Sequence, residues 1–343
     1  ACKTYACSDV RLHVPPDSLT APQRTQVEGL EVDVDVDPLV TGWDAELTRP
    51  TLGSSQSDSA NLLAALSAQG APAESIDFSV QQRLSRVIRE YDWSLRVALH
   101  DKEVVSVAPL DTKWLGLAVD IGTTKIAGYL LDMENGRTLA SKGMMNPQIS
   151  YGEDVISRIV AASKTAADGD RLQYLLTNAL SELAADLCEE SGAQPEQIVD
   201  AVVVCNTAIH HLFLGLPVKQ LGLAPYIPTV DDAIDVKARE IGVKIASGAY
   251  VHLMPNIAGY VGADHVSMLL ATRIADADGV TLAIDIGTNT EICLNNNGKL
   301  TSTSCASGPA FEGAHIKFGM RAAPGAIEHV RLEGDRLEIQ TIA

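Results

Sequence analysis

The sequence has 343 residues, of which 46% are apolar and 20% charged, and it carries a formal net charge of −18 at pH 7. This length and composition are typical of a soluble globular protein of two or three domains, whereas a nucleic-acid surface needs clustered Lys and Arg. Apolar runs stop well short of the ~20 residues of a membrane span and no signal peptide opens the sequence, so we expect a cytoplasmic protein that binds neither nucleic acid nor membrane.

The first 110 residues show no pattern of catalytic side chains. Residues 1–28 are rich in Pro ("VPPDSLTAPQR") and predict a linker, and residues 29–110 predict a small α+β domain with a docking or spacer role. Alternating apolar residues indicate strands, and apolar spacings of three and four indicate helices. The elements expected here are a strand at 31–38 ended by Pro38, a helix at 59–69, a helix at 80–91 with Val80, Leu84, Val87 and Ile88 on its apolar face, and a hairpin at 94–109 that turns near residues 100–102.

Residues 111–279 predict a first α/β subdomain. Three short strands come first, separated by a glycine-containing turn and by "MENGR", and helices and strands then alternate. Gly192 is a typical residue to end a helix. The expected elements are strands at 114–122, 125–132 and 139–146, a helix from 150 with Val155, Ile156, Ile159 and Val160 at core spacing, a helix at 171–192, a strand at 198–206, a helix with Thr207 near its N-cap, a strand at 249–255 and a helix at about 261–274.

Residues 280–343 restart the same pattern as a second subdomain. "VTLAIDIG", "TEICLNNN" and "KLTSTSCA" again give three strands, and a helix at 308–319 and a hairpin at 327–342 should follow. The two copies start 165 residues apart, counted from Asp120 to Asp285, a spacing that suits a duplicated subdomain rather than a solenoid repeat. The second copy lacks the later elements of the first, so we expect the natural protein to continue.

The repeated string is a strand that ends in Asp and a turn of Gly and Thr: "DIGTTK" at 120–125 and "DIGTN" at 285–289. Backbone N–H groups and hydroxyls in such turns form a cradle for phosphate. The residues expected to contact phosphate are Gly122, Thr123, Thr124 and Lys125 in the first turn and Gly287, Thr288 and Asn289 in the second. Tight turns that only reverse the chain would look the same, but two matched copies favour phosphate binding.

Asp120 and Asp285 end the strands that precede these turns, and we expect them to face one another across a cleft. Two carboxylates there suit Mg²⁺ held largely through water, or the orientation of an attacking water. Carboxylates that simply cap the turns are the alternative. The chemistry predicted for the pair of turns is phosphoryl transfer or ATP hydrolysis between two lobes, with Asp120 and Asp285 as the catalytic residues.

The two turns resemble the two phosphate motifs of the actin-like ATPase superfamily, over about 114–343. Three further strings, "NPQISYGEDVISRI", "CNTAIHHLFLGLP" and "SGPAFEGAHI", are similar to the reductive activators of corrinoid proteins, the RACo and RamA-like ATPases. This resemblance implies a fold of class α/β: a duplicated RNase H-like (actin-like ATPase) domain preceded by a linker and a small α+β middle domain. The region boundaries expected are 1–28, 29–110, 111–279 and 280–343.

The resemblance also implies the activity, which is ATP-dependent return of an inactive Co(II) corrinoid to Co(I) in a methyltransferase system such as anaerobic O-demethylation. It implies ATP and Mg as cofactors, a corrinoid protein and an electron donor as partners, and a homodimer as one form of assembly. The opening "ACKTYACSDVRLHVPP" resembles the junction after a 2Fe–2S ferredoxin-like domain, and Cys2 matches the last cluster cysteine. Because such a cluster needs four ligands, we expect it only in an intact longer protein.

Several other residues admit two interpretations each. Glu291 could accept a hydrogen bond from a water or a ribose, or be an ordinary strand glutamate, and Asp154 could line the cleft or offset a helix dipole. Ser307 and Gly308 would begin a helix whose N-terminus faces an anion. The remaining candidates are His210 and His211, of which at most one could be a cobalt ligand and which are more simply core or surface residues, and Cys188, Cys205 and Cys293, expected as small core residues.

Two other functions fit the same fold. A small-molecule kinase would need an acceptor pocket, which nothing in the sequence specifies. A nucleotide-gated scaffold of the filament-forming kind would polymerise on adding ATP, which light scattering would detect. The three family-like strings favour the corrinoid activator over both.

Overall fold

The structure is a computed structural model that describes residues 36–53, 56–307, 325, 327–333 and 336–341. Contacts divide the chain into two units, residues 25–307 and residues 1–24 with 308–343. The described part of the second unit is essentially the antiparallel hairpin of β14 (Ile327–Glu333) and β15 (Arg336–Thr341), as predicted. Among the described residues, none of the helices has the length and apolarity needed to cross a bilayer.

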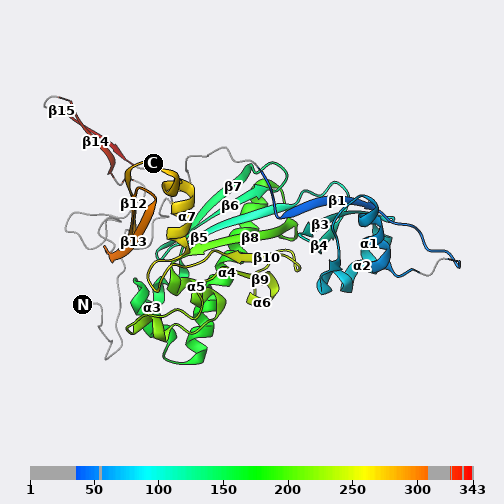
Figure 1. The fold of residues 1–343 in the computed structure, drawn as a ribbon, viewed down its shortest axis with the longest axis horizontal. Helices are drawn as coiled ribbons and strands as arrows, with labels where there is room; N and C mark the ends of the chain where they lie inside the picture. The colour runs from blue at the N-terminus through cyan, green and yellow to red at the C-terminus, as the bar shows by residue number, and fades with distance from the viewer. Residues whose placement is uncertain (1–35, 54–55, 308–324, 326, 334–335, 342–343) are drawn as a thin grey trace, which may run out of the picture. The chain divides into compact units, whose positions relative to one another are not determined.

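Residues 36–111 form an α+β domain with its own apolar core (Figure 1). Its sheet has the order β1-β3-β4-β2, in which only β2 and β4 run parallel. Helices α1 and α2 and the hairpin are confirmed, whereas residues 36–38 are not in a strand and residues 31–35 lie outside the described part. The elements are β1 (Val40–Glu46), α1 (Asp58–Ala68), β2 (Ser75–Ile76), α2 (Phe78–Glu90), β3 (Ser94–His100) and β4 (Glu103–Ala108).

Residues 114–277 form the central domain, whose six-stranded sheet has the order β7-β6-β5-β8-β10-β9. β5, β8 and β10 are parallel to one another, and β6, β7 and β9 pair antiparallel. The three strands followed by alternating helices and strands are confirmed, and β9 and α6 were not predicted. The elements are β5 (Leu115–Ile121), β6 (Lys125–Asp132), β7 (Thr138–Met145), α3 (Val155–Ala162), α4 (Ala166–Ser191), β8 (Ile198–Cys205), α5 (Thr207–Leu214), β9 (Ile234–Lys237), α6 (Ala238–Ile241), β10 (Tyr250–Leu253) and α7 (Ala263–Thr272).

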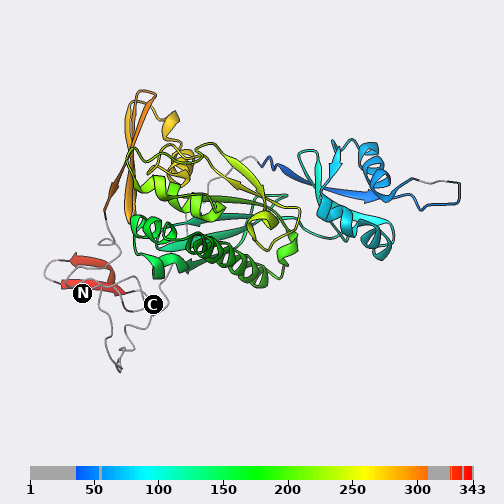
Figure 2. The same cartoon turned by 90° about the horizontal axis from the view of Figure 1, so that it is seen from below.

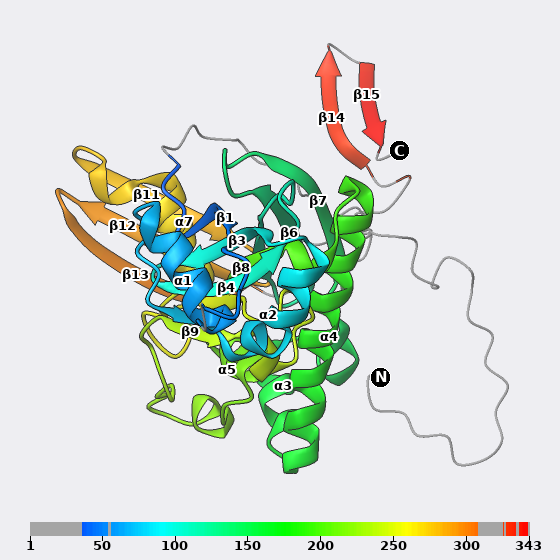
Figure 3. The same cartoon turned by 90° about the vertical axis from the view of Figure 1, so that its right-hand side faces the viewer.

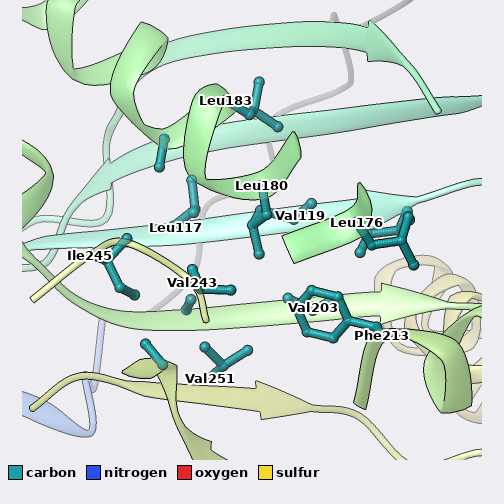
Figure 4. Close-up of a cluster of buried hydrophobic side chains, with 14 of the residues drawn as sticks. Leu117, Val119, Leu176, Leu180, Leu183, Val203, Phe213, Val243, Ile245 and Val251 are labelled. Carbon is teal, nitrogen blue, oxygen red and sulfur yellow. The ribbon is translucent and has the colours of Figure 1, made fainter. Parts of the chain in front are cut away.

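The long helix α4 packs across one face of this sheet (Figures 2 and 3). Its leucines meet the apolar side chains of β5 and β8, as Leu180 and Val119 illustrate (Figure 4). Each such buried side chain contributes about 1.5–3 kcal/mol relative to exposure. Gly128 on β6 allows the close approach, because a Cβ there would lie 2.7 Å from Leu183 Cδ2. Gly192 ends the helix in the left-handed conformation, as predicted.

Helix α3 corrects one sequence prediction. Val155 and Ile159 are buried, but Ile156 is 47% exposed and Val160 58% exposed. The helix has only one inward face, and its buried residues include a charged one, Arg158. The spacing of apolar residues therefore misidentified one edge of the helix, because the pattern counts arginine as a surface residue.

The second copy begins with a separate three-stranded antiparallel sheet, in the predicted order. Its strands are β11 (Val280–Ile286), β12 (Asn289–Asn296) and β13 (Lys299–Ala306). Leu282 and Ile284 on β11 are exposed, whereas Leu117 and Val119, which hold the same places in the first copy, are buried. The helix predicted at 308–319 lies outside the described residues.

A buried ionic network joins the α+β domain to the central domain. Lys237 Nζ on β9 donates to Glu103 Oε2 at 2.6 Å and lies 3.3 Å from Asp77 Oδ2. Arg239 also donates to both oxygens of Asp77, at 2.9 and 3.0 Å. Burial alone would raise the pKa of Asp77, but the bonds from Ser79 and the two cations outweigh it and lower the pKa. The two domains are therefore bound by an ionic network in which Lys237 and Asp77 have little access to water.

Candidate functional site

The two DIGT turns lie side by side, although one follows β5 and the other follows β11. Thr124 Oγ1 and Thr288 Oγ1 are 3.2 Å apart and share a hydrogen bond. Each turn is tight: in the first, a Cβ on Gly122 would lie 2.8 Å from Lys125 O, and in the second, Gly287 N donates to Asn289 O at 3.0 Å. The structure therefore brings the sequence-predicted residues of the two turns together.

Ser307 also joins the second turn. Its backbone N–H donates to Thr288 O at 3.3 Å, and its hydroxyl lies 2.5 Å from Thr290 Oγ1. Gly308, the other residue expected at a helix N-terminus here, lies outside the described residues, as does Cys2. Lys125 is the first residue of β6, and it interacts with other residues of the chain.

Acidic side chains gather next to the turns. Asp120, near the end of β5, keeps part of its surface exposed to solvent. The protein atoms around its carboxyl group displace much of the surrounding water, and together with the charges of Asp264 and Asp285 this raises its pKa to about 7. Burial and the charge of Asp285 also raise the pKa of Asp264 to about 6, against the opposing bond from the His265 N–H. Three carboxylates thus share one electrostatic environment that favours binding of a proton or a cation.

Asp264 is the residue that the sequence analysis missed. It lies in the first turn of α7, after Gly262. A Cβ on Gly262 would lie 2.5 Å from Asn206 Cα and 2.7 Å from Cys205 O, so only glycine lets α7 begin against the end of β8. Because β8 runs parallel to β5, this packing brings Asp264 to the edge of the sheet at which Asp120 lies. The only sequence signal was an acidic residue at a helix start.

Glu291 on β12 belongs to the same acidic environment. It pairs in register with Asp285, is 7% exposed, and accepts a hydrogen bond from the Ser304 hydroxyl at 2.9 Å. The pKa of Glu291 is raised to about 7, mainly by burial and further by the charges of Asp264 and Asp285. The hydrogen bond from Ser304 acts in the opposite direction. Its partner is thus a serine on β13, and the carboxyl group is poised to change protonation near neutral pH.

Within the described residues, no group of three or more His, Cys, Asp or Glu side chains is placed to hold a metal ion. A divalent ion that keeps most of its water needs fewer protein ligands, as Mg²⁺ usually does. The mutual repulsion among Asp120, Asp264 and Asp285 is also what a bound cation would relieve. The acidic residues therefore fit a magnesium ion that is held largely through water. They do not fit an ion whose ligands all come from the protein.

The other candidates lie in structural positions. Asp154 is the N-cap of α3 and accepts hydrogen bonds from the Ser157 N–H and hydroxyl, both at 2.8 Å. His211 Nδ1 lies 2.8 Å from Thr207 O and Nε2 accepts from the Thr229 N–H at 2.9 Å, which fixes its tautomer. His210 and His211 are both fully buried, so neither is open to a corrinoid. Cys188, Cys205 and Cys293 are buried, as predicted.

Three family descriptions match successive parts of the chain. Residues 29–113 match the RACo linker region, 115–277 the RACo middle region, and 279–343 the C-terminal domain of RACo, the ASKHA domain. The chain belongs to the RACo family. The ASKHA description names the actin-like fold and confirms the predicted fold class.

Relatives of known activity match more than half of the chain. The corrinoid activation enzyme RamQ of Eubacterium limosum is 35% identical over 78% of this chain and 45% of its own length. The [Co(II) methylated amine-specific corrinoid protein] reductase of Methanosarcina barkeri is 30% identical over 64% of this chain and 41% of its own. A solved reductive activator for corrinoid,iron-sulfur protein has a TM-score of 0.78 at 34% identity, covering 96% of this chain and 55% of that one. The chain thus spans about half the length of these relatives.

Proposed function

We propose that the whole protein is an ATP-dependent reductive activator, which returns the inactive Co(II) form of a corrinoid protein to Co(I). The observation that carries the proposal is the apposition of the two DIGT turns, with 3.2 Å between Thr124 Oγ1 and Thr288 Oγ1, in a chain of the RACo family. The relatives described as a corrinoid activation enzyme and a Co(II) corrinoid protein reductase support it.

The nucleotide phosphates would lie between the two turns. Gly122, Thr123 and Thr124 offer amides and hydroxyls from one side, and Lys125 offers a positive charge for the outer phosphates. From the other side, the turn of Gly287, Thr288 and Asn289 would offer the Thr288 hydroxyl and the Asn289 side chain, with Gly287 leaving room for the phosphates. The hydroxyl of Ser307 lies 2.5 Å from Thr290 Oγ1 and stabilises that turn. Gly308 follows Ser307 in the sequence and would extend this side.

Asp120 and Asp285 would hold a hydrated magnesium ion and orient the attacking water. The ion, when bound, supplies positive charge that neutralises the phosphates. Asp120, whose pKa is about 7, is suited to accept the proton of that water near neutral pH. Asp264 and Glu291 keep the local potential negative and so favour both the cation and the protonated acid.

ATP binding would act on electron transfer through the relative arrangement of the two copies. A ligand that contacts both turns binds best when they are in one arrangement, and it shifts the population towards it. If the corrinoid protein prefers the same arrangement, nucleotide and partner bind cooperatively. Reduction of Co(II) would then be driven by an external electron donor, through a 2Fe–2S cluster of the whole protein with Cys2 as its last ligand.

The remaining assignments rest on the sequence patterns and on the family resemblance. They are the regions 1–28, 29–110, 111–279 and 280–343, a cytoplasmic location, a homodimer, and a role in a methyltransferase system such as O-demethylation. The family matches that begin at residues 29, 115 and 279 support the boundaries.

The test is reduction of a Co(II) corrinoid protein, followed by its absorption spectrum. The complete protein, a reductant and ATP should produce the Co(I) spectrum, and omission of ATP should leave Co(II). Asp120→Asn, which keeps the shape of the side chain but not its charge, should bind the corrinoid protein and fail to activate it. Equal reduction with and without ATP would refute the proposal.

A further inference from the structure

The carbonyl oxygens of the first DIGT turn are all bound from within the central domain. Asn146, which follows β7, donates from Nδ2 to Gly122 O at 2.8 Å and from its backbone N–H to Thr124 O at 2.9 Å. Between these two, Arg158 on α3 donates from Nη2 to Thr123 O. Three successive carbonyls are therefore held in place by two residues that are each 1% exposed.

Fixing these carbonyls also fixes the amides of the turn. In a planar trans peptide the C=O and the next N–H point in opposite directions. The N–H groups of Thr123 and Thr124 must therefore point away from Asn146 and Arg158. In the described part of the chain no acceptor is bonded to either of them. Adjacent amides that point the same way form a site for an anion.

Asn206 orients the one side chain of the turn that is also buried. Its Nδ2 donates to Thr123 Oγ1 at 3.2 Å, while its Oδ1 accepts from the Ile209 N–H and caps α5. Because Oγ1 accepts here, the hydroxyl proton of Thr123 remains free to donate in another direction. The N-cap hydrogen bond thus holds the Asn206 side chain in place, and Asn206 in turn orients the Thr123 hydroxyl.

Arg158 is an uncommon residue at such a depth. Nε donates to Gly152 O at 2.9 Å and Nη2 to Thr123 O, and both acceptors are backbone carbonyls. Nη1 is buried without a hydrogen-bond partner, and no carboxylate in the described residues forms an ion pair with this arginine. A buried cation with no carboxylate bonded to it is costly to retain, although the charge of Asp154 favours its protonated form. Burial lowers its pKa to about 10, which still leaves it charged at neutral pH.

We infer that Asn146, Arg158 and Asn206 are positioning residues for nucleotide phosphate: they hold the first turn with its amides and the Thr123 hydroxyl directed at the anion, and Arg158 adds positive charge behind it. The inference rests on the proposed function, since it takes the ligand of the turn to be a nucleotide. None of the three needs to touch the nucleotide. The inference also gives a physical role to "NPQISYGEDVISRI" and "CNTA", the strings that supply these residues.

The test is nucleotide binding by the complete protein, measured by calorimetry with ATP and with AMP. Arg158→Met keeps the aliphatic stem and removes the charge and both bonds. It should lower ATP affinity by about tenfold or more, as expected for loss of charge-assisted hydrogen bonds. AMP lacks the outer phosphates and should bind about as well as to the unchanged protein. The control is Arg171→Met, an exposed arginine on α4 that contacts Tyr174.

Two further variants guard against a folding defect. Arg158→Lys keeps the charge and can reach one carbonyl, so its ATP affinity should be intermediate, and Asn206→Ala removes only the bond to Thr123 and the cap of α5. Thermal unfolding identifies any variant that fails to fold. Unchanged ATP affinity in Arg158→Met and Asn206→Ala, or equal losses for ATP and AMP, would overturn the inference. Absence of ATP binding by the unchanged protein would instead overturn the proposed function.

Discussion

Thr124 and Thr288 are 164 positions apart in the sequence, yet their hydroxyl oxygens lie 3.2 Å from each other. This bond joins the first copy of the motif to the second, in which Thr288 holds the place of Thr123 and Asn289 that of Thr124, so both turns contribute to one site. A phosphate placed between the turns would accept a hydrogen bond from each hydroxyl, and the bond between the two hydroxyls would be broken. The contact between Thr124 and Thr288 therefore indicates a site that is built from both copies.

Replacement of either threonine by valine should weaken ATP binding. Valine has nearly the same shape and lacks the hydroxyl, so the variant loses one donor to phosphate. We expect a loss of about tenfold for Thr124→Val and for Thr288→Val, measured by calorimetry. Thr272→Val is the matched control, because that hydroxyl bonds only atoms of its own helix, α7. Affinities unchanged in both variants would remove the turns from the site.

Asp264→Asn should slow ATP turnover and change its pH dependence. The charge of Asp264 is one cause of the raised pKa of Asp120, so its removal lowers that pKa. Asp120 then stays ionised to lower pH, and the acidic limb of the rate profile should move to lower pH. Loss of the carboxylate should also reduce turnover by about tenfold. Asp276→Asn, at an exposed pair with Arg273, is the control, and a profile unmoved in the Asp264 variant would contradict the coupling.

Lys237→Met should destabilise the junction between the α+β domain and the central domain. The change leaves Glu103 and Asp77 short of a cation in a site where the lysine side chain is 9% exposed. Breaking one partner of a buried pair costs roughly 3 kcal/mol of unfolding free energy. Lys102→Met, which breaks the exposed pair with Glu74, should cost under about 1 kcal/mol in the same urea titration. Equal costs would show that the buried network adds nothing.

Local patterns in the sequence predicted the strands around the turns, the apolar face of α2 and the end of α4 at Gly192. Each of these depends on residues close together in the chain. Asp120 and Asp285 are distant in the sequence, and their pairing could be predicted only because the motif occurs twice.

The parts that could not be predicted depend on packing between distant segments. Asp264 joins the acidic set only because Gly262 lets α7 begin against the end of β8. Arg158 fills the inward face of α3, which a pattern based on apolar residues assigned in part to Ile156 and Val160. Buried charged residues that serve a site are thus the ones that hydrophobic periodicity overlooks.

His210 should make the protein sensitive to acid. The imidazole is fully buried and neither ring nitrogen has a hydrogen-bond partner in the described structure. Burial and the neighbouring His211 lower its pKa to about 4, against about 6.5 in an unfolded chain. Between these values the unfolded state binds the proton more readily. The stability that the neutral histidine provides is therefore complete above about pH 6.5 and is lost as pH falls towards 4.

His210→Phe removes this titration and keeps the volume of the ring. The wild-type protein should lose up to roughly 3 kcal/mol of unfolding free energy from His210 between pH 7 and pH 4. The variant should lose correspondingly less, while at pH 7 it should be about as stable as the wild type, because the ring makes no hydrogen bond. Urea unfolding of both proteins across this range measures the difference. If the two curves fall in parallel with pH, His210 is protonated as easily in the folded state as in the unfolded one, which would contradict its burial.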